Sequence, residues 1–104
     1  MPPDIEIIME SQTFEWDLFK EESNLEKHGI DFRNASEAFF DSSRIILKDS
    51  LHSAEEQRFF CLGKVDSKVL TVRFVRRGKK IRIFGAAKWR KWEKFYNGHQ
   101  KEKD

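Results

Sequence analysis

The sequence predicts an α+β domain, and two groups of signals indicate that fold class. The first is a set of strand-like runs between Glu56 and Gly85, joined by segments too short for a parallel crossover. The second is a set of helical segments with recognisable ends, which flank these runs along the chain. We therefore expect a short first strand, two helices, an antiparallel sheet of about four strands and a closing helix.

The beginning of the chain has a weak pattern. The isoleucine-rich stretch at residues 5–8 is compatible with either an edge strand or an irregular start, so residues 1–12 are expected to be peripheral. Residues 13–16 alternate between polar and apolar side chains and are expected to form the first clear strand.

Two helices are predicted next, each from signals at its ends. Asp17 is a candidate N-cap for a helix over Leu18–His28, and Gly29 suits the left-handed position that ends a helix. Asp31 is the candidate N-cap of the second helix. An apolar stripe at helical spacing predicts that the second helix packs on the core; it consists of Phe32, Ala35, Ala38 and Phe39.

The sheet is predicted from a short strand over residues 44–48, a loop over 49–55 and three longer runs over 56–63, 69–75 and 80–85. Alternate side chains of a strand point to the same face. One arginine in each of the three runs is therefore expected on the open face of the sheet, with the helices covering the other face. These are Arg58, Arg73 and Arg82.

The closing helix is expected over residues 86–97. Its aromatic stripe of Trp89, Trp92, Phe95 and Tyr96 is expected to pack on the sheet, and lysines line another side. Gly98 is expected to end the helix, so that residues 98–104 form a frayed tail.

Length and composition limit the class of protein. A chain of 104 residues predicts a single domain. Cys61 is the sole cysteine, which excludes an internal disulfide and is typical of the reducing cytoplasm. The sequence contains no apolar run of membrane-spanning length, and its start lacks the layout of a signal peptide. We expect a cytoplasmic protein with no membrane association.

Charge is distributed unevenly along the chain. Residues 1–41 hold 11 acidic and 3 basic side chains, whereas residues 42–104 hold 7 acidic and 17 basic ones. A basic half favours binding to a polyanion such as RNA or DNA. The alternative is that the acidic half folds against the basic half and the two fields partly cancel.

The sequence contains no motif for a metal or an organic cofactor. Its three histidines are widely separated, and neither a phosphate-binding loop nor a dinucleotide fingerprint occurs. The available side chains suit RNA cleavage by the substrate's own 2′-hydroxyl. Such cleavage needs a base for that hydroxyl and cations for the charge that builds on the phosphate, and arginine is well shaped for the second task.

Several spaced residues resemble those of the BrnT family, the ribonuclease toxins of bacterial type II toxin–antitoxin pairs. They cover about residues 14 to 96 and are Phe14-x-Trp16-Asp17, Lys20, Asn24, Lys27-His28-Gly29, Phe32, Ala35-x-x-Ala38-Phe39, Asp41, Glu56-x-Arg58, Gly63, Arg82-Ile83, Ala86 and Glu93-x-x-Tyr96. The resemblance implies a RelE-like fold, mRNA cleavage that blocks translation, and a ribbon-helix-helix, BrnA-like antitoxin. That antitoxin also represses the operon, so DNA is contacted only indirectly.

Two sets of candidate site residues follow from these observations. We expect catalytic roles for Arg58, Arg82, Glu56, His28 and Tyr96. We expect RNA binding by Arg73, Lys88, His52 and Lys91.

One departure from the family pattern concerns Ala87. The family typically has Ile-Ser-Ala-Arg where this chain has Phe84-Gly85-Ala86-Ala87, so the expected arginine is absent and Lys88 follows instead. A lysine replaces an arginine only partly at a phosphate, because it lacks the bidentate fork. The alternative to an active toxin is therefore a noncatalytic nucleic-acid-binding or partner-binding module.

Overall fold

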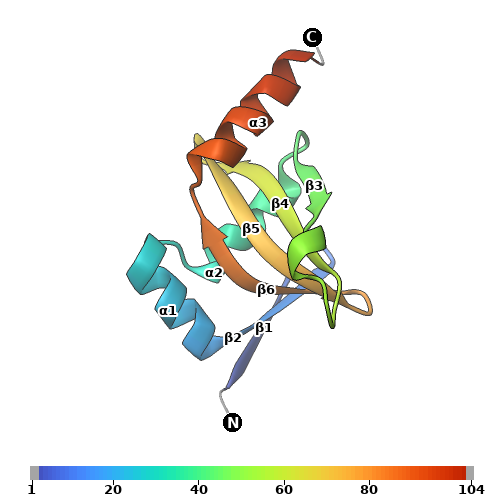
Figure 1. Cartoon of the computed structure of the whole chain (residues 1–104). Coiled ribbons are helices and arrows are strands. Elements are labelled where there is room, and N and C mark those ends of the chain that lie inside the picture. The colour runs from blue at the N-terminus through green and yellow to red at the C-terminus, as the bar shows by residue number, and fades with distance from the viewer. Residues whose placement is uncertain (1–2, 103–104) are drawn as a thin grey trace.

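Six strands form one mixed sheet in the computed structural model, which describes residues 3–102 (Figure 1). The strand order is β1-β2-β6-β5-β4-β3, and every neighbouring pair is antiparallel except β2 and β6. The strands are β1 Asp4–Met9, β2 Gln12–Asp17, β3 Ile45–Lys48, β4 Arg58–Val65, β5 Lys68–Arg77 and β6 Lys80–Ala87. The α+β class is confirmed, but the sheet is larger than the predicted four antiparallel strands.

The sheet exceeds the expected one in two ways, an edge strand and a parallel strand pair, and both involve the N-terminal residues. The isoleucine-rich stretch is a true edge strand, β1, which forms a hairpin with β2 around Glu10 and Ser11. Both turn residues have a positive φ, of 47° and 71°, although neither is the glycine or asparagine that usually marks such a turn. The parallel contact joins Phe14 to Ile81 and Glu15 to Arg82, which brings the first strands beside the last. Residues 1 and 2 of the predicted periphery lie outside the described residues.

The helix ends form as their sequence signals predict. Helix α1 (Leu18–His28) is capped by Asp17, whose carboxylate accepts hydrogen bonds from the backbone N–H groups of Phe19 and Lys20. Gly29 ends α1 at φ 70°. Asp31 caps the short helix α2 (Phe32–Ser36), which continues as the 3-10 helix η1 (Glu37–Phe40). A second 3-10 turn, η2 (Ser50–His52), lies in the loop before β4.

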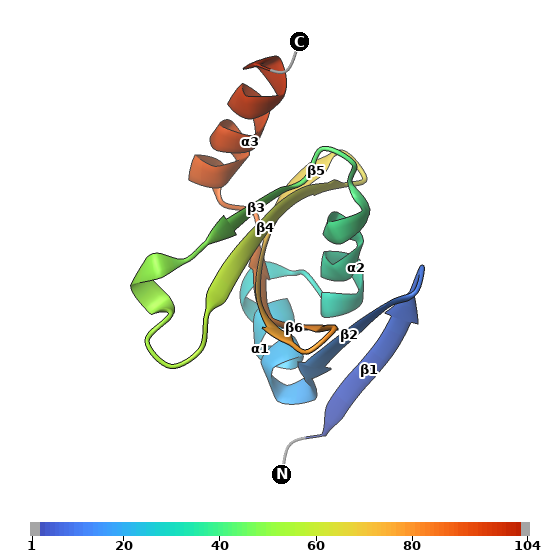
Figure 2. The same cartoon turned by 90° about the vertical axis from the view of Figure 1, so that its right-hand side faces the viewer.

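One face of the sheet is covered by α2 and η1, which pack over it in Figure 2. The buried core on this side includes Phe14, Phe39, Val72, Phe74 and Ile83. The contact is closest at Gly63 of β4, because a Cβ atom there would lie 2.2 Å from the carbonyl oxygen of Ala38 in η1.

Helix α3 (Arg90–Glu102) differs from the prediction in the sheet face on which it packs and in the residues at which it begins and ends. It packs on the opposite face of the sheet from α2, where Trp92 and Tyr96 contact Phe60 and Leu62 of β4. The helices therefore do not all cover one face. Strand β6 also runs to Ala87, so the helix begins later than predicted and continues through Gly98.

The end of α3 is tied to the body of the protein. The side-chain amide of Gln100 donates a hydrogen bond to the carbonyl of Ser43, which explains why helix replaces the expected frayed tail up to residue 102. Residues 103 and 104 lie outside the described range. None of the helices in the described part of the chain is long and apolar enough to span a membrane.

Candidate functional site

The predicted arginines share the sheet face on which α3 also packs. Strand pairing places Arg58 opposite Val75 and Val75 opposite Arg82, so the two arginines lie in one row across β4, β5 and β6. Arg73 lies two residues from Val75 on the same face and pairs with Phe60. The face is thus open near these arginines and covered by α3 at its other end.

A bulge in β6 brings two of these arginines together over one ring. The register shifts between Arg73 and Phe74, so that Gly85 faces Arg73 while Phe84 is the extra residue. The guanidinium carbons of Arg58 and Arg73 lie 5.0 and 4.8 Å from the centre of the Phe84 ring. Phe84 therefore supports both cations through its π face.

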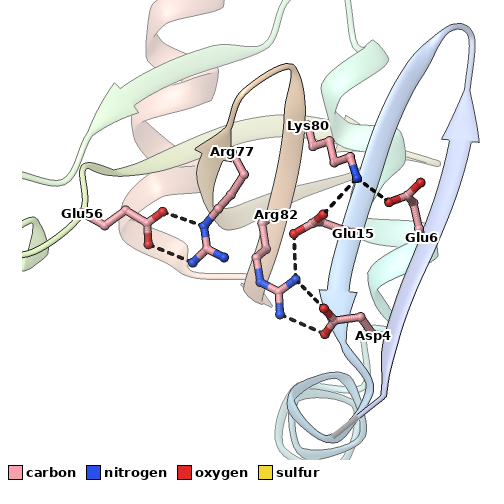
Figure 3. A network of polar contacts seen from close by, with 7 residues as sticks. All are labelled: Asp4, Glu6, Glu15, Glu56, Arg77, Lys80 and Arg82. Carbon is pink, nitrogen blue, oxygen red and sulfur yellow. Dashed lines mark hydrogen bonds and ion pairs between the residues drawn. The ribbon is translucent and has the colours of Figure 1, made fainter. Parts of the chain in front are cut away.

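Three other basic residues near this site, Arg77, Lys80 and Arg82, are paired with carboxylates, as Figure 3 shows. Arg82 binds Asp4 at 3.0 Å and Glu15 at 2.7 Å, and only 19% of its side chain is exposed. Lys80 binds Glu6 at 2.8 Å. The acidic N-terminal hairpin therefore neutralises part of the basic half, which is the alternative that the sequence left open.

Arg58 and Arg73 differ from these residues because neither has an ion-pair partner among the described residues. Burial lowers the pKa of Arg73, and the nearby charge of Arg58 lowers it further, whereas the charge of Asp49 raises it. Two cations in contact with one ring, one of them partly buried, form a site that favours an anion.

The loop before β4 places a histidine beside this cation pair. Nδ1 of His52 lies 2.9 Å from Oδ2 and 3.1 Å from Oδ1 of Asp49, whose side chain is 8% exposed. With Nδ1 as the donor to this carboxylate, Nε2 of His52 is left without a hydrogen-bond partner among the described residues. His52 and Arg58 line the same hollow, together with Leu51 and Glu56.

Ser53 fixes this loop to the start of β4. Its hydroxyl donates to the carbonyl of Asp49 at 2.6 Å and accepts from the backbone N–H of Arg58 at 2.9 Å. The N–H of Asp49 also donates to the carbonyl of Arg58. The histidine and the arginine are therefore held by one set of hydrogen bonds.

Tyr96, for which a catalytic role was expected, is buried in a contact between α3 and the body of the protein. Its ring is 4% exposed, and its hydroxyl donates to Oδ2 of Asp41 at 2.5 Å. Burial and this carboxylate raise the pKa of Tyr96 to about 12. Asp41 also accepts the backbone N–H groups of Ser43 and Lys64. The contact joins α3 to the body of the protein.

The remaining candidates have other contacts. Glu56 lines the hollow with Arg58, but its carboxylate is bound to Arg77, whose hydrogen bond lowers the pKa of Glu56. His28 is exposed at the end of α1. Lys88 lines a separate pocket beside the end of α1, and Lys91 lies 5.0 Å from the ring of Trp92 on α3.

Ala87 lies beside an unusual polar group. It is 2% exposed and pairs with Thr71 of β5, whose hydroxyl oxygen is buried without a hydrogen-bond partner among the described residues. Cys61 is also buried, and burial raises the pKa of its thiol to about 12, so it is a core residue and a poor nucleophile.

Sequence reasoning missed two residues of the site, Asp49 and Phe84. Asp49 lies in the predicted loop over residues 49–55, and the signal that could have found it is its position three residues before His52. Phe84 shares the arginine parity of β6, yet the bulge that places it under both guanidiniums has no clear sequence signal. Within residues 3–102, no group of three or more metal-ligating side chains is present.

Comparison with known proteins assigns the family. No curated protein matches the chain closely enough to be counted as a relative. A family model described as the ribonuclease toxin BrnT of type II toxin–antitoxin systems matches residues 16–93, which include the cation pair, His52 and Asp49. The chain therefore belongs to the BrnT family of ribonuclease toxins from type II toxin–antitoxin systems.

Proposed function

We propose that this BrnT toxin is a metal-independent endoribonuclease that cuts mRNA and thereby inhibits translation. The observation that carries the proposal is the pairing of Arg58 and Arg73, free of carboxylate partners among the described residues, beside the oriented imidazole of His52. The proposal includes the RelE-like assignment that the family resemblance implies.

In the proposed reaction, the 2′-hydroxyl of the substrate attacks the adjacent phosphorus. Nε2 of His52 accepts the hydroxyl proton, the bond from O2′ to phosphorus forms, and the bond from phosphorus to O5′ breaks. The products carry a 2′,3′-cyclic phosphate and a 5′-hydroxyl, whose proton comes from solvent because the site is open. Asp49 positions His52 and stabilises its protonated form.

Arg58 and Arg73 bind the phosphate that is being cut. Their planar guanidinium groups donate to the non-bridging oxygens and stabilise the negative charge that develops there. They need no rearrangement for this task, because Phe84 already holds both groups. In this proposal Arg82 does not touch the phosphate, since both of its terminal nitrogens already donate to carboxylates, those of Asp4 and Glu15.

The family implies an antitoxin partner, and we propose a ribbon-helix-helix protein of the BrnA type. Contact with DNA would then be made by the antitoxin and only indirectly by this chain. An mRNA substrate and the reduced Cys61 are both consistent with action in the cytoplasm.

One observation favours a rival function, that of an RNA-binding module without cleavage activity. The family resemblance leads us to expect an arginine at the position of Ala87, and Lys88 lines a separate pocket beside Gly29. Such a module would bind RNA in a salt-dependent manner and leave it intact.

Incubation of the purified protein with RNA in EDTA separates these functions. Cleavage to cyclic phosphate ends, together with resistance of a substrate that has a 2′-deoxyribose at the cut site, supports the proposed enzyme. Arg76→Ala is the matched control for Arg58→Ala, because Arg76 lies on the other sheet face over Phe59 and Phe74. Intact RNA with wild-type protein, or equal cleavage by Arg58→Ala, would contradict the proposal.

A further inference from the structure

A continuous series of aromatic rings leads away from the cation pair along α3. Phe60, which pairs with Arg73 across the sheet, lies 5.5 Å from Trp92 between ring centres. Trp92 lies 5.8 Å from Phe95, and Phe95 lies 6.4 Å from His99 with the two rings stacked. We call these four residues, Phe60, Trp92, Phe95 and His99, the aromatic track.

The outer part of the track is accessible. Phe95 is 46% exposed, and Trp92 and His99 are half-buried. Figures 1 and 2 show that α3 projects beyond the end of the sheet, so that its outer turns lie away from the other helices. The packing of α3 on the sheet uses Tyr96 and Trp92 and does not require a large exposed ring at position 95.

The charge around the track is strongly positive. Residues 88–101 hold five lysines and arginines and one acidic residue, Glu93. Nζ of Lys91 lies 5.0 Å from the centre of a ring of Trp92, and none of residues 88–101 forms an ion pair with another described side chain. Exposed rings among unpaired cations suit a flexible polyanion that carries flat bases.

We propose that the aromatic track binds the single-stranded RNA that flanks the scissile phosphate, with bases stacked on Trp92 and Phe95 and phosphates near Lys91. The inference rests on the proposed ribonuclease function, because it extends the same substrate beyond the cut site. Continuity favours RNA as the occupant, since Phe60 of the track pairs with Arg73 across neighbouring strands. A protein partner would have to offset the same positive charge with acidic residues.

The test compares a long and a short ligand. The long ligand is a single-stranded 2′-O-methyl RNA of about ten nucleotides, which cannot be cut and is long enough to reach beyond one site. The short ligand is a dinucleotide with one scissile phosphate. We expect Phe95→Ala combined with His99→Ala to weaken binding of the long RNA by about tenfold or more, while dinucleotide cleavage is unchanged.

Two controls make the result specific. Phe19→Ala removes another exposed phenylalanine, on α1, and should leave RNA affinity unchanged. Thermal melting of the double variant should match that of the wild type, because the substituted side chains lie on the outer part of α3.

Unchanged affinity for the long RNA in the double variant would overturn the inference. So would loss of antitoxin binding with RNA affinity intact, because the track would then be a protein interface. If wild-type protein binds the long RNA through the track but does not cut the dinucleotide, the proposed ribonuclease function is contradicted while RNA binding by the track is supported.

Discussion

Asp49 and His52 form a pair in which a nearly buried carboxylate orients an exposed imidazole. The distance from Nδ1 of His52 to Oδ2 of Asp49 is 2.9 Å, and 61% of the histidine side chain is exposed compared with 8% for the aspartate. The nitrogen that remains free is therefore held in position and open to a ligand.

His52→Ala should lower the rate of RNA cleavage by about 100-fold, because it removes the proposed base. Asp49→Asn should reduce kcat by about tenfold with little change in KM, because an amide can donate to Nδ1 and favour the wrong tautomer. Separate measurement of kcat and KM for both variants checks the role. His28→Ala is the matched control and should behave as wild type. Unchanged kcat in both variants would assign the pair a structural role.

Arg58→Ala and Arg73→Ala should each lower kcat/KM by about 100-fold, since each removes a donor to the developing charge. Neither change should lower the melting temperature much, because the two cations repel each other and lack carboxylate partners among the described residues. Cleavage assays and thermal melts should be compared with those of Arg76→Ala. A large fall in melting temperature for Arg58→Ala would show that the cation pair serves the fold.

Arg82→Met should destabilise the protein by about 1–3 kcal/mol, because Glu15 would stay partly buried with only its longer contact to Lys80, at 3.9 Å. Cleavage should change only a few-fold, since both terminal nitrogens of Arg82 already donate to carboxylates. Urea unfolding measures the first effect, and Glu15→Gln in the same background should restore part of the stability. Complete loss of cleavage with unchanged stability would instead place Arg82 on the phosphate.

Tyr96→Phe should cost about 1–2 kcal/mol of stability and leave cleavage nearly unchanged, because the hydroxyl is bound to Asp41.

Partial burial opposes ionisation of Asp41, but hydrogen bonds from Tyr96, Lys64 and Ser43 outweigh it and lower the pKa below 3.8. The stabilisation from Asp41 is thus present above pH 3.8 and lost as pH falls through the lowered pKa. Asp41→Asn should differ most from wild type at neutral pH, and urea unfolding across acid pH would show the difference shrinking. A difference that grows on acidification would contradict this account.

Gly63→Ala should destabilise the protein by about 2 kcal/mol or more, because its Cβ would overlap the carbonyl oxygen of Ala38 and displace η1. Gly98→Ala is the paired control, since a Cβ at that position meets no atom within 4 Å. That second change lies within a helix and should be neutral or stabilising by up to about 1 kcal/mol. Chemical denaturation of both variants gives the comparison, and equal stabilities would rule out the close contact.

The predicted and observed folds differ mainly where the chain contacts distant segments. The hairpin of β1 and β2 turns at Glu10 and Ser11, which carry no glycine or asparagine signal for a positive φ. The pairing of β2 with β6 joins residues 67 positions apart, such as Glu15 and Arg82. Such pairing depends on how the whole sheet closes, and no local pattern encodes it.

By itself, the sequence determined the ends of α1, the stripe that packs α2 and η1 on the core, and the sheet face of each arginine. These depend on neighbouring residues: caps, helical spacing and the two-residue period of a strand. Only the tertiary structure decided which arginines remain free. Asp4 and Glu15 neutralise Arg82, whereas Arg58 and Arg73 meet over Phe84, because charges pair through space between strands that are distant in the chain.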